Sequence, residues 1–221
     1  MCLIVLGWKK LAGYPLVVAA NRDEFHGRPA AAAAFWPDRP AILGGRDLEA
    51  KGTWMGVARN GRFAAVTNYR GASEPRAAES RGALVTKFLE TDASPASYME
   101  SVETRKNLYS GFNLLVADNE ELWSMSNRDG PPRRLEPGIY GLGNTLLDAA
   151  EVDRPKARFA AALRPAVEPL FCLLAESKIV NARYGTRCST VMFISNNKKI
   201  RYAERSFSAD GADQETLHYE F

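Results

Sequence analysis

The sequence contains few of the residues that cross-link a chain or hold a metal, with three cysteines and two histidines in 221 positions. Cys2, Cys172 and Cys188 are odd in number and form no C-x-x-C pair. This pattern argues against a disulfide framework and against a zinc site. We therefore expect no bound metal, no required cofactor and a reducing, cytoplasmic location.

Long apolar runs and an excess of one charge are also missing. The first apolar run spans only about seven residues, and Lys9 and Lys10 follow it, whereas the positive charges of a secretory signal precede its apolar run. No later stretch approaches the roughly 18 apolar residues of a membrane span. The 29 basic and 26 acidic residues are interspersed and leave no dense basic block for nucleic acid. We expect a soluble protein with no integral membrane segment and no nucleic-acid partner.

The chain does have enough apolar residues, 46% of its length, to bury a full core, and we expect one domain over residues 1–221. We predict strands over residues 2–8, 15–20, 53–58, 62–68, 112–118, 121–125, 189–195, 199–204 and 218–221. We predict helices over residues 80–90, 94–105 and 153–163 and from Pro165 into the 170s. Residues 26–51, rich in proline, glycine and alanine, have the composition of an irregular loop.

Strand hairpins imply antiparallel pairing, and pairs of amphipathic helices need sheet faces to cover. The predicted fold class is therefore α+β, a four-layer α-β-β-α sandwich with mainly antiparallel sheets.

Cys2 follows Met1 directly, at the head of the first predicted strand. If Met1 is removed, Cys2 carries a thiol and an α-amine with a pKa near ~8, which can take the proton of the thiol. The polar residues Asn21-Arg22-Asp23-Glu24 come where the second strand of the same hairpin is predicted to end, and therefore near Cys2. A guanidinium at this place would lower the pKa of the thiol, and a carboxylate would orient the amine.

Recognisable motifs are dense over residues 1–70 and continue as islands afterwards. They include Met1-Cys2-Leu3-Ile4-Val5, Asn21-Arg22-Asp23-Glu24, Gly45-Arg46-Asp47-Leu48, Gly52-Thr53-Trp54-Met55-Gly56-Val57, Tyr140-Gly141-Leu142-Gly143-Asn144 and Tyr184-Gly185-Thr186-Arg187-Cys188. In these motifs the chain resembles the NRDE family, also called the transport and Golgi organisation protein 2 family. The resemblance implies a fold like that of the N-terminal nucleophile hydrolases, which agrees with the four-layer order above.

Within that fold, the pattern is similar to the cysteine enzymes that cleave bile-salt and penicillin V amides. The similarity implies catalytic roles for Cys2, Asp23, Asn68, Asn144 and Arg187, with the two asparagines stabilising an oxyanion. Those enzymes carry Arg-Asn-x-Asp, whereas this chain reads Ala20-Asn21-Arg22-Asp23, so its arginine lies two positions later. The NRDE family is connected with haem trafficking and with binding of acyl-coenzyme A or lipids. This connection implies ligand contacts from Asn21, Arg22, Asp23, Glu24, His26 and Asn68, with haem as a bound cargo.

Two functions from different classes follow. The first is a small-molecule carrier for haem or an acyl-coenzyme A-like amphiphile, with its cleft around Cys2 and residues 21–24. The second is a cysteine amidohydrolase of the N-terminal nucleophile type, which requires removal of Met1; whether the chain is an enzyme stays open. In both cases we expect Cys2, Arg22, Asp23, Asn68, Asn144 and Arg187 to converge on one cleft. We also expect Arg22 or Arg187 to lower the pKa of Cys2.

Overall fold

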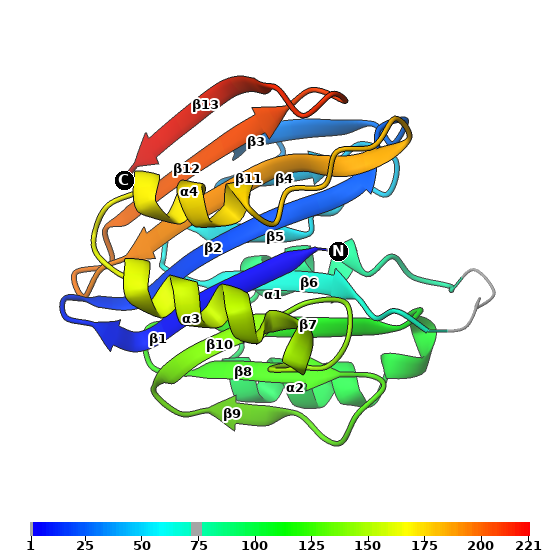
Figure 1. Cartoon of the computed structure of the whole chain (residues 1–221). Coiled ribbons are helices and arrows are strands. Elements are labelled where there is room, and N and C mark those ends of the chain that lie inside the picture. The colour runs from blue at the N-terminus through cyan, green and yellow to red at the C-terminus, as the bar shows by residue number, and fades with distance from the viewer. Residues whose placement is uncertain (1, 72–76) are drawn as a thin grey trace. The chain divides into compact units, whose positions relative to one another are not determined.

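The computed structural model of the chain describes residues 2–71 and 77–221. The chain forms two compact units, each built on one antiparallel sheet (Figure 1). Unit 1 comprises Met1–Pro29, Pro137–Gly143 and Leu147–Phe221, and unit 2 comprises Ala30–Glu136 and Asn144–Leu146. The expectation of a single domain over residues 1–221 stays a prediction.

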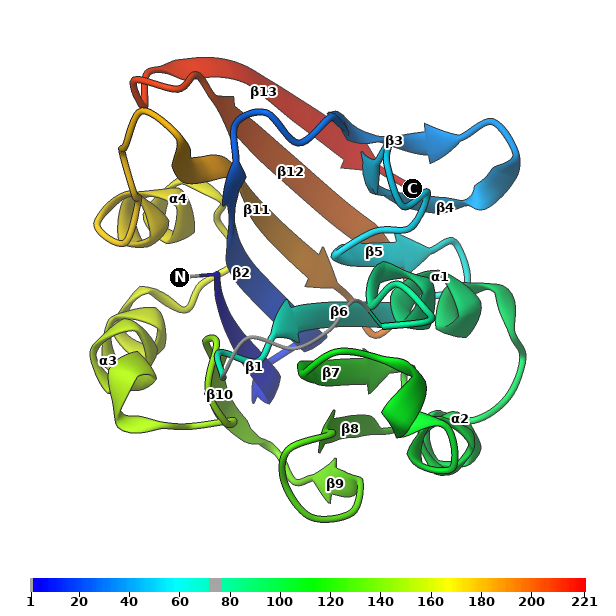
Figure 2. The same cartoon turned by 90° about the vertical axis from the view of Figure 1, so that its right-hand side faces the viewer.

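Unit 1 contains a six-stranded sheet with the strand order β10-β1-β2-β11-β12-β13. Its strands are β1 (Leu3–Leu11), β2 (Tyr14–Phe25), β10 (Gly138–Leu142), β11 (Tyr184–Ile194), β12 (Ile200–Phe207) and β13 (Asp213–Glu220). Its helices are η2 (Ala150–Val152), α3 (Asp153–Ala162) and α4 (Glu168–Ala175). Figure 2 shows α3 and α4 on one face of this sheet.

Side-chain alternation explains why unit 1 carries its helices on one face. Leu3 and Val5 of β1 are buried in one apolar cluster with Phe159 of α3 and Leu174 of α4. Neighbouring residues of a strand point to opposite faces, so Cys2 and Ile4 stand on the face away from these helices. The polar residues discussed below are divided between these two faces.

Unit 2 contains a seven-stranded sheet in which each strand pairs with its neighbour in sequence. Its strands are β3 (Ala30–Trp36), β4 (Arg39–Asp47), β5 (Met55–Ala58), β6 (Phe63–Asn68), β7 (Phe112–Ala117), β8 (Leu122–Ser126) and β9 (Arg133–Leu135). Its helices are α1 (Gly82–Glu90), α2 (Pro95–Glu103) and η1 (Lys106–Leu108). Leu84 and Phe88 of α1 and Met99 of α2 are buried against this sheet in one cluster.

Local sequence signals are confirmed where they are strong. The Asn60-Gly61 pair turns β5 into β6, with Gly61 at a φ of +88°. Ser94 caps α2, because its Oγ accepts a hydrogen bond from the backbone N–H of Ser97 at 3.1 Å. The helices predicted over residues 80–90 and 153–163 are α1 and α3.

Three expectations differ from the structure. The predicted loop over residues 26–51 contains β3 and β4, which pair with each other although alanine has a weak strand propensity. The short strands β9 and β10 were not predicted, and β10 owes its place to its pairing with β1. Residues 21–24, interpreted as the end of a strand, lie inside β2, because β11 continues to pair with β2 as far as Phe25.

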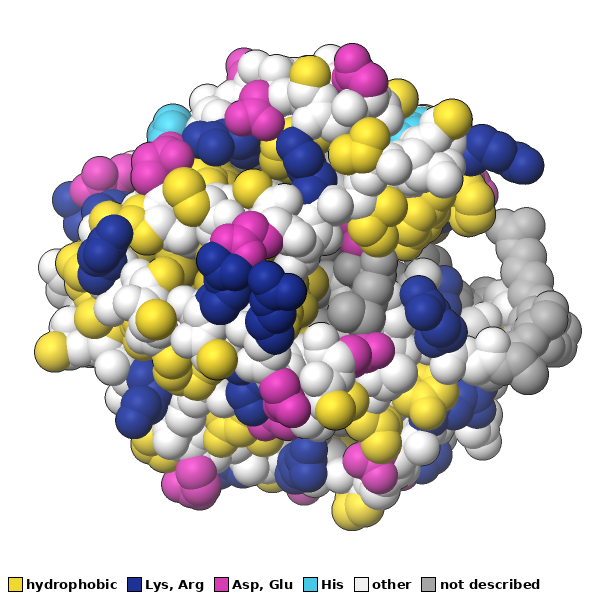
Figure 3. Space-filling view, in the orientation of Figure 1, with side chains coloured by type: hydrophobic (Ala, Val, Ile, Leu, Met, Phe, Trp, Pro, Cys, Tyr) yellow, Lys and Arg dark blue, Asp and Glu magenta, His cyan; other side chains and the backbone are white. Residues whose placement is uncertain are grey.

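The charged surface agrees with the sequence composition. On the face shown in Figure 3, basic and acidic side chains are interspersed among hydrophobic ones. Across residues 2–71 and 77–221, no helix has both the length and the apolar character to cross a membrane.

Candidate functional site

The thiol of Cys2 lies against the backbone of Asp23 on the neighbouring strand. Its Sγ accepts a hydrogen bond from the Asp23 N–H and donates one to the Asp23 carbonyl, both at 3.4 Å. Leu3 pairs with Asn21 in the β1–β2 register, so Cys2 stands across from Arg22. The sequence prediction that the tetrapeptide lies near Cys2 is therefore confirmed.

The electrostatic expectation for Cys2 is wrong. Burial and the nearby Asp23 carboxylate raise the pKa of the Cys2 thiol from 9.0 to about 11. Arg22 does lower this pKa, but as the smaller effect. A thiol with this pKa is almost entirely protonated at neutral pH.

Asn21 and Asp23 hold unit 1 together on the helix-covered face of its sheet. Asn21 is buried, and its Nδ2 donates to the Leu174 carbonyl of α4 at 2.9 Å while its Oδ1 accepts from Ser189 at 2.6 Å. The buried Asp23 carboxylate accepts a hydrogen bond from Thr186 at 2.6 Å. Both side chains therefore have structural partners, and their predicted catalytic and ligand-binding roles stay predictions.

Arg22 is the cation of the site, on the opposite face of β2. Its side chain is 6% exposed and forms a long ion pair with Glu24, with 3.9 Å between Nη2 and Oε2. The other carboxylate oxygen of Glu24 accepts a hydrogen bond from the Phe25 N–H. The planar guanidinium of an arginine can donate two parallel hydrogen bonds, which suits it to bind a carboxylate or a phosphate.

Arg187 and His26 hold the loop that follows β2. Nη1 of Arg187 donates to the carbonyl oxygens of Phe25 and His26 at 3.1 Å and of Arg28 at 3.4 Å. Nε2 of His26 lies 2.9 Å from the carbonyl of Asn181, so ligation of haem iron by this nitrogen would break that contact. The predicted catalytic role of Arg187 and the ligand contact of His26 stay predictions.

Sequence reasoning missed several residues of β11 and β12 beside the tetrapeptide. They are Thr186, Ser189, Thr190 and Glu204, and all four are buried. The strand predicted over residues 189–195 is part of β11, but a single sequence does not show which residue of β11 faces which residue of β2. The observed register places Cys188 directly across from Arg22.

Asn68 and Asn144 lie together in unit 2. Nδ2 of Asn144 donates to the Asn68 carbonyl at 2.8 Å. The buried Asn113, also missed from sequence, donates through its own Nδ2 to Thr145 O at 2.8 Å and to Thr67 Oγ1 at 3.1 Å. The structure thus brings the two predicted asparagines together and groups Cys2 with Arg22, Asp23 and Glu24 in unit 1, whereas Arg187 contacts the loop after β2. The convergence of both groups on one cleft stays a prediction.

Unit 1 also contains a cavity of about 290 Å³ near Leu3. Leu3, Leu173 and Ile179 give it an apolar floor, and Arg154, Arg158 and Glu176 stand around it. Glu176 pairs with both arginines. Leu3 points toward α3 and α4, so this cavity lies on the face opposite to Cys2 and Arg22.

A family model and related sequences indicate the same family for this chain. A family model described as Transport and Golgi organisation 2 matches residues 1–171. The Transport and Golgi organization protein 2 homolog of Homo sapiens is 34% identical, and the match covers 94% of this chain and 92% of that protein. The corresponding homolog of Mus musculus is 32% identical over the same shares.

Comparison with solved structures shows the fold. The C2A mutant of conjugated bile acid hydrolase from Clostridium perfringens matches with a TM-score of 0.56, 11% identity and coverage of 100% of this chain and 97% of that one. The Caenorhabditis elegans ortholog of N-acylethanolamine-hydrolyzing acid amidase matches with a TM-score of 0.55, 14% identity and coverage of 86% and 92%. The predicted fold class, an α+β sandwich like that of the N-terminal nucleophile hydrolases, is confirmed, with mainly antiparallel sheets and helices on each.

Proposed function

Since the chain belongs to the Transport and Golgi organisation 2 family, we propose that it is a small-molecule carrier whose site in unit 1 holds haem or an acyl-coenzyme A-like amphiphile. The ligand would lie beside Cys2 and residues 21–24, with its anionic group at Arg22. The three cysteines, none of them in a disulfide, fit the cytoplasmic location that belongs to this proposal.

The observation that carries the proposal is the buried guanidinium of Arg22, which stands across from Cys2. Burial raises the pKa of the Cys2 thiol to about 11 in the chain that keeps Met1. A neutral thiol is a weak nucleophile, whereas a partly desolvated guanidinium binds anions strongly. Haem carries carboxylates and acyl-coenzyme A carries phosphates, so both ligands offer Arg22 the same chemistry.

A second candidate is a cysteine amidohydrolase. The position of Cys2 at the head of β1 favours it, together with a fold shared with enzymes named as a bile acid hydrolase and an acid amidase. In this case Met1 is removed, and the α-amine of Cys2 takes the proton of the thiol. Asn68 and Asn144 would then stabilise the oxyanion.

One set of variants separates the two functions. Arg22→Gln removes the cation, and we expect it to weaken binding of haemin or of an acyl-coenzyme A about 10-fold or more, because a charge-assisted hydrogen bond contributes roughly 1.5–3 kcal/mol. Cys2→Ala should leave this binding nearly intact. The measurement is a ligand titration at equal protein concentration, with thermal unfolding to confirm that each variant is folded.

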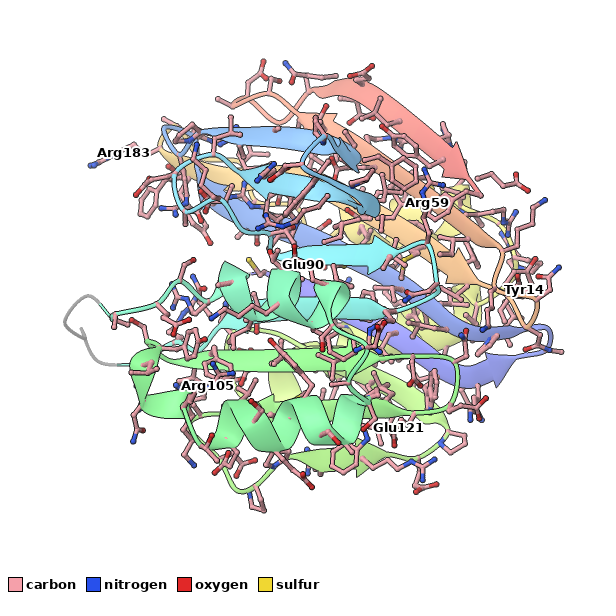
Figure 4. The ribbon with its side chains drawn as sticks, turned by 180° about the vertical axis from the view of Figure 1, so that it is seen from behind. Tyr14, Arg59, Glu90, Arg105, Glu121 and Arg183 are labelled. Atoms are coloured by element: carbon pink, nitrogen blue, oxygen red, sulfur yellow. The ribbon has the colours of Figure 1, made fainter. Side chains whose placement is uncertain are left out.

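Arg183→Gln is the matched control, because Arg183 is exposed and projects outward from the loop before β11 (Figure 4). Equal binding by wild type and Arg22→Gln would overturn the carrier at this site. A mature protein lacking Met1, whose turnover of an N-acyl amide disappears in Cys2→Ala, would establish the hydrolase. Only Arg22 of the tetrapeptide is changed in this test. Substituting Asn21 or Asp23 as well would remove their hydrogen bonds to Leu174 and Thr186 and so destabilise unit 1.

A further inference from the structure

A buried carboxylate lies in the same row of side chains as Cys2 and Arg22. Arg22 pairs with Cys188 across β2 and β11, and Thr190, two residues further on the same face, pairs with Glu204 of β12. Cys2, Arg22 and Cys188 therefore lie across from one another, and Glu204 lies one diagonal step away on β12, where Ser206 is the direct partner of Cys188. The strands β1, β2, β11 and β12 are adjacent in the sheet (Figure 2). Glu204 is only 2% exposed and Arg22 only 7%.

Glu204 has hydroxyl donors on its own face. The hydroxyl groups of Thr190 and Tyr202 donate to Glu204 Oε2, at 3.4 Å and 3.5 Å. Both contacts are long, and neither donor carries a charge. A buried carboxylate is costly unless a cation accompanies it, and a buried guanidinium needs an anion for the same reason.

The pKa of the Cys188 thiol depends on the charges of both Arg22 and Glu204. Burial and Glu204 raise the pKa of Cys188, whereas Arg22 lowers it. Other ionisable groups near the row are Asp23, Glu24, Tyr202 and Tyr219. Glu204 raises the pKa of Tyr202 and of Tyr219 as well, but for both tyrosines burial is the larger cause.

The two thiols of the row are not a disulfide pair. Cys2 and Cys188 lie on strands separated by β2, and two strand spacings amount to roughly 9.5 Å. A disulfide requires Cα atoms less than about 7 Å apart. Any interaction between these two thiols is therefore electrostatic and not a covalent bond.

Arg22 already forms a long ion pair with Glu24. We propose that Glu204 is a second counter-charge of Arg22 and sets how much positive charge the site offers to Cys2, to Cys188 and to an anionic ligand. Glu204 is thus a positioning residue that acts through Arg22. The part that concerns the ligand rests on the proposed carrier function, whereas the part that concerns the thiols does not.

The experiment is the pH profile of thiol alkylation, followed for each cysteine by peptide mass mapping. Glu204→Gln removes the negative charge at nearly constant volume. We expect the midpoint for Cys188 to fall by about one pH unit, a tenfold change in thiolate at a given pH, with a smaller fall for Cys2. Cys172, exposed on α4, is the internal reference and should not change. An unchanged Cys188 midpoint in folded Glu204→Gln would overturn the proposal.

Further variants separate charge from loosened packing. Thr190→Val removes one donor and keeps the carboxylate, and local opening would raise alkylation by the same factor at every pH without moving the midpoint. Glu204→Asp keeps the charge and should keep the midpoint. If Glu204→Gln does not fold, Arg22→Gln serves as the test, and it must move the Cys188 midpoint upward.

Ligand titration of Glu204→Gln completes the experiment. We expect haemin or an acyl-coenzyme A to bind about 3-fold to 10-fold more tightly, because Arg22 loses its internal competitor. A shifted thiol midpoint with unchanged binding would support the counter-charge and contradict the carrier site at Arg22. Changed binding with an unshifted midpoint would overturn the counter-charge.

Discussion

At the scale of single residues, neighbours that are distant in sequence decide the chemistry. Cys2 could be identified from the sequence as the reactive residue to examine. The direction of its pKa shift could not, because the shift depends on burial and on the Asp23 carboxylate, which Thr186 holds from β11. Residue type alone suggested the opposite direction, since Arg22 is adjacent and cationic.

Asp23→Asn tests this account of Cys2. The amide keeps an acceptor for the Thr186 hydroxyl and removes the negative charge. We therefore expect the pKa of Cys2 to fall below its value of about 11, as measured by the pH dependence of its reaction with a disulfide probe. Asp38→Asn, on an exposed carboxylate of unit 2, is the control. A Cys2 profile that does not change in Asp23→Asn would leave burial as the whole cause.

At the scale of elements, the quality of prediction follows how local the signal is. The Asn60-Gly61 turn and the Ser94 cap act within a few residues and were predicted correctly. The alanine-rich β3 was not, because its strand conformation depends on pairing with β4. For the same reason, Glu204 and Asn113 could not be predicted as residues of the site, because their positions depend on the register between strands.

Gly61→Ala tests the turn between β5 and β6. Gly61 has a φ of +88°, and an added Cβ would lie 3.1 Å from Oδ1 of Asn119. We expect a loss of about 1 kcal/mol or more in the free energy of unfolding, measured by urea denaturation. Gly130→Ala is the matched control, since no atom lies within 4 Å of its added Cβ. Equal losses in both variants would contradict the role of the left-handed conformation.

At the scale of the whole molecule, the buried thiols and phenols couple stability to alkaline pH. Burial raises the pKa of Cys2 from 9.0 to about 11 and that of Tyr109 from 10.0 to about 12, and it raises those of Cys188, Tyr98 and Tyr202 as well. Between these values the folded state binds more protons than the unfolded state. The free energy of unfolding must therefore fall as the pH rises through this range.

We expect the stability from these groups to be fully present below pH 9 and to decline as the pH rises through about 11, where the loss from Cys2 alone is roughly 2 kcal/mol. Urea denaturation at a series of pH values measures the decline. Cys2→Ser removes one titrating group and should make the decline shallower. Stability that is constant or rises above pH 9 would contradict the raised pKa values.

The construction of unit 1 from three separate segments has a consequence for the chain during synthesis. Asn21 and Ser189 bond to each other across 168 positions, so the first strands leave the ribosome long before β11 exists. Unit 2, almost wholly continuous from Ala30 to Glu136, can fold earlier. Cys2 and residues 21–24 are thus exposed on the nascent chain until β11 pairs with β2. A thiol-reactive probe added during synthesis should therefore label Cys2 on nascent chains that end before β11, and label it more slowly once the chain is complete.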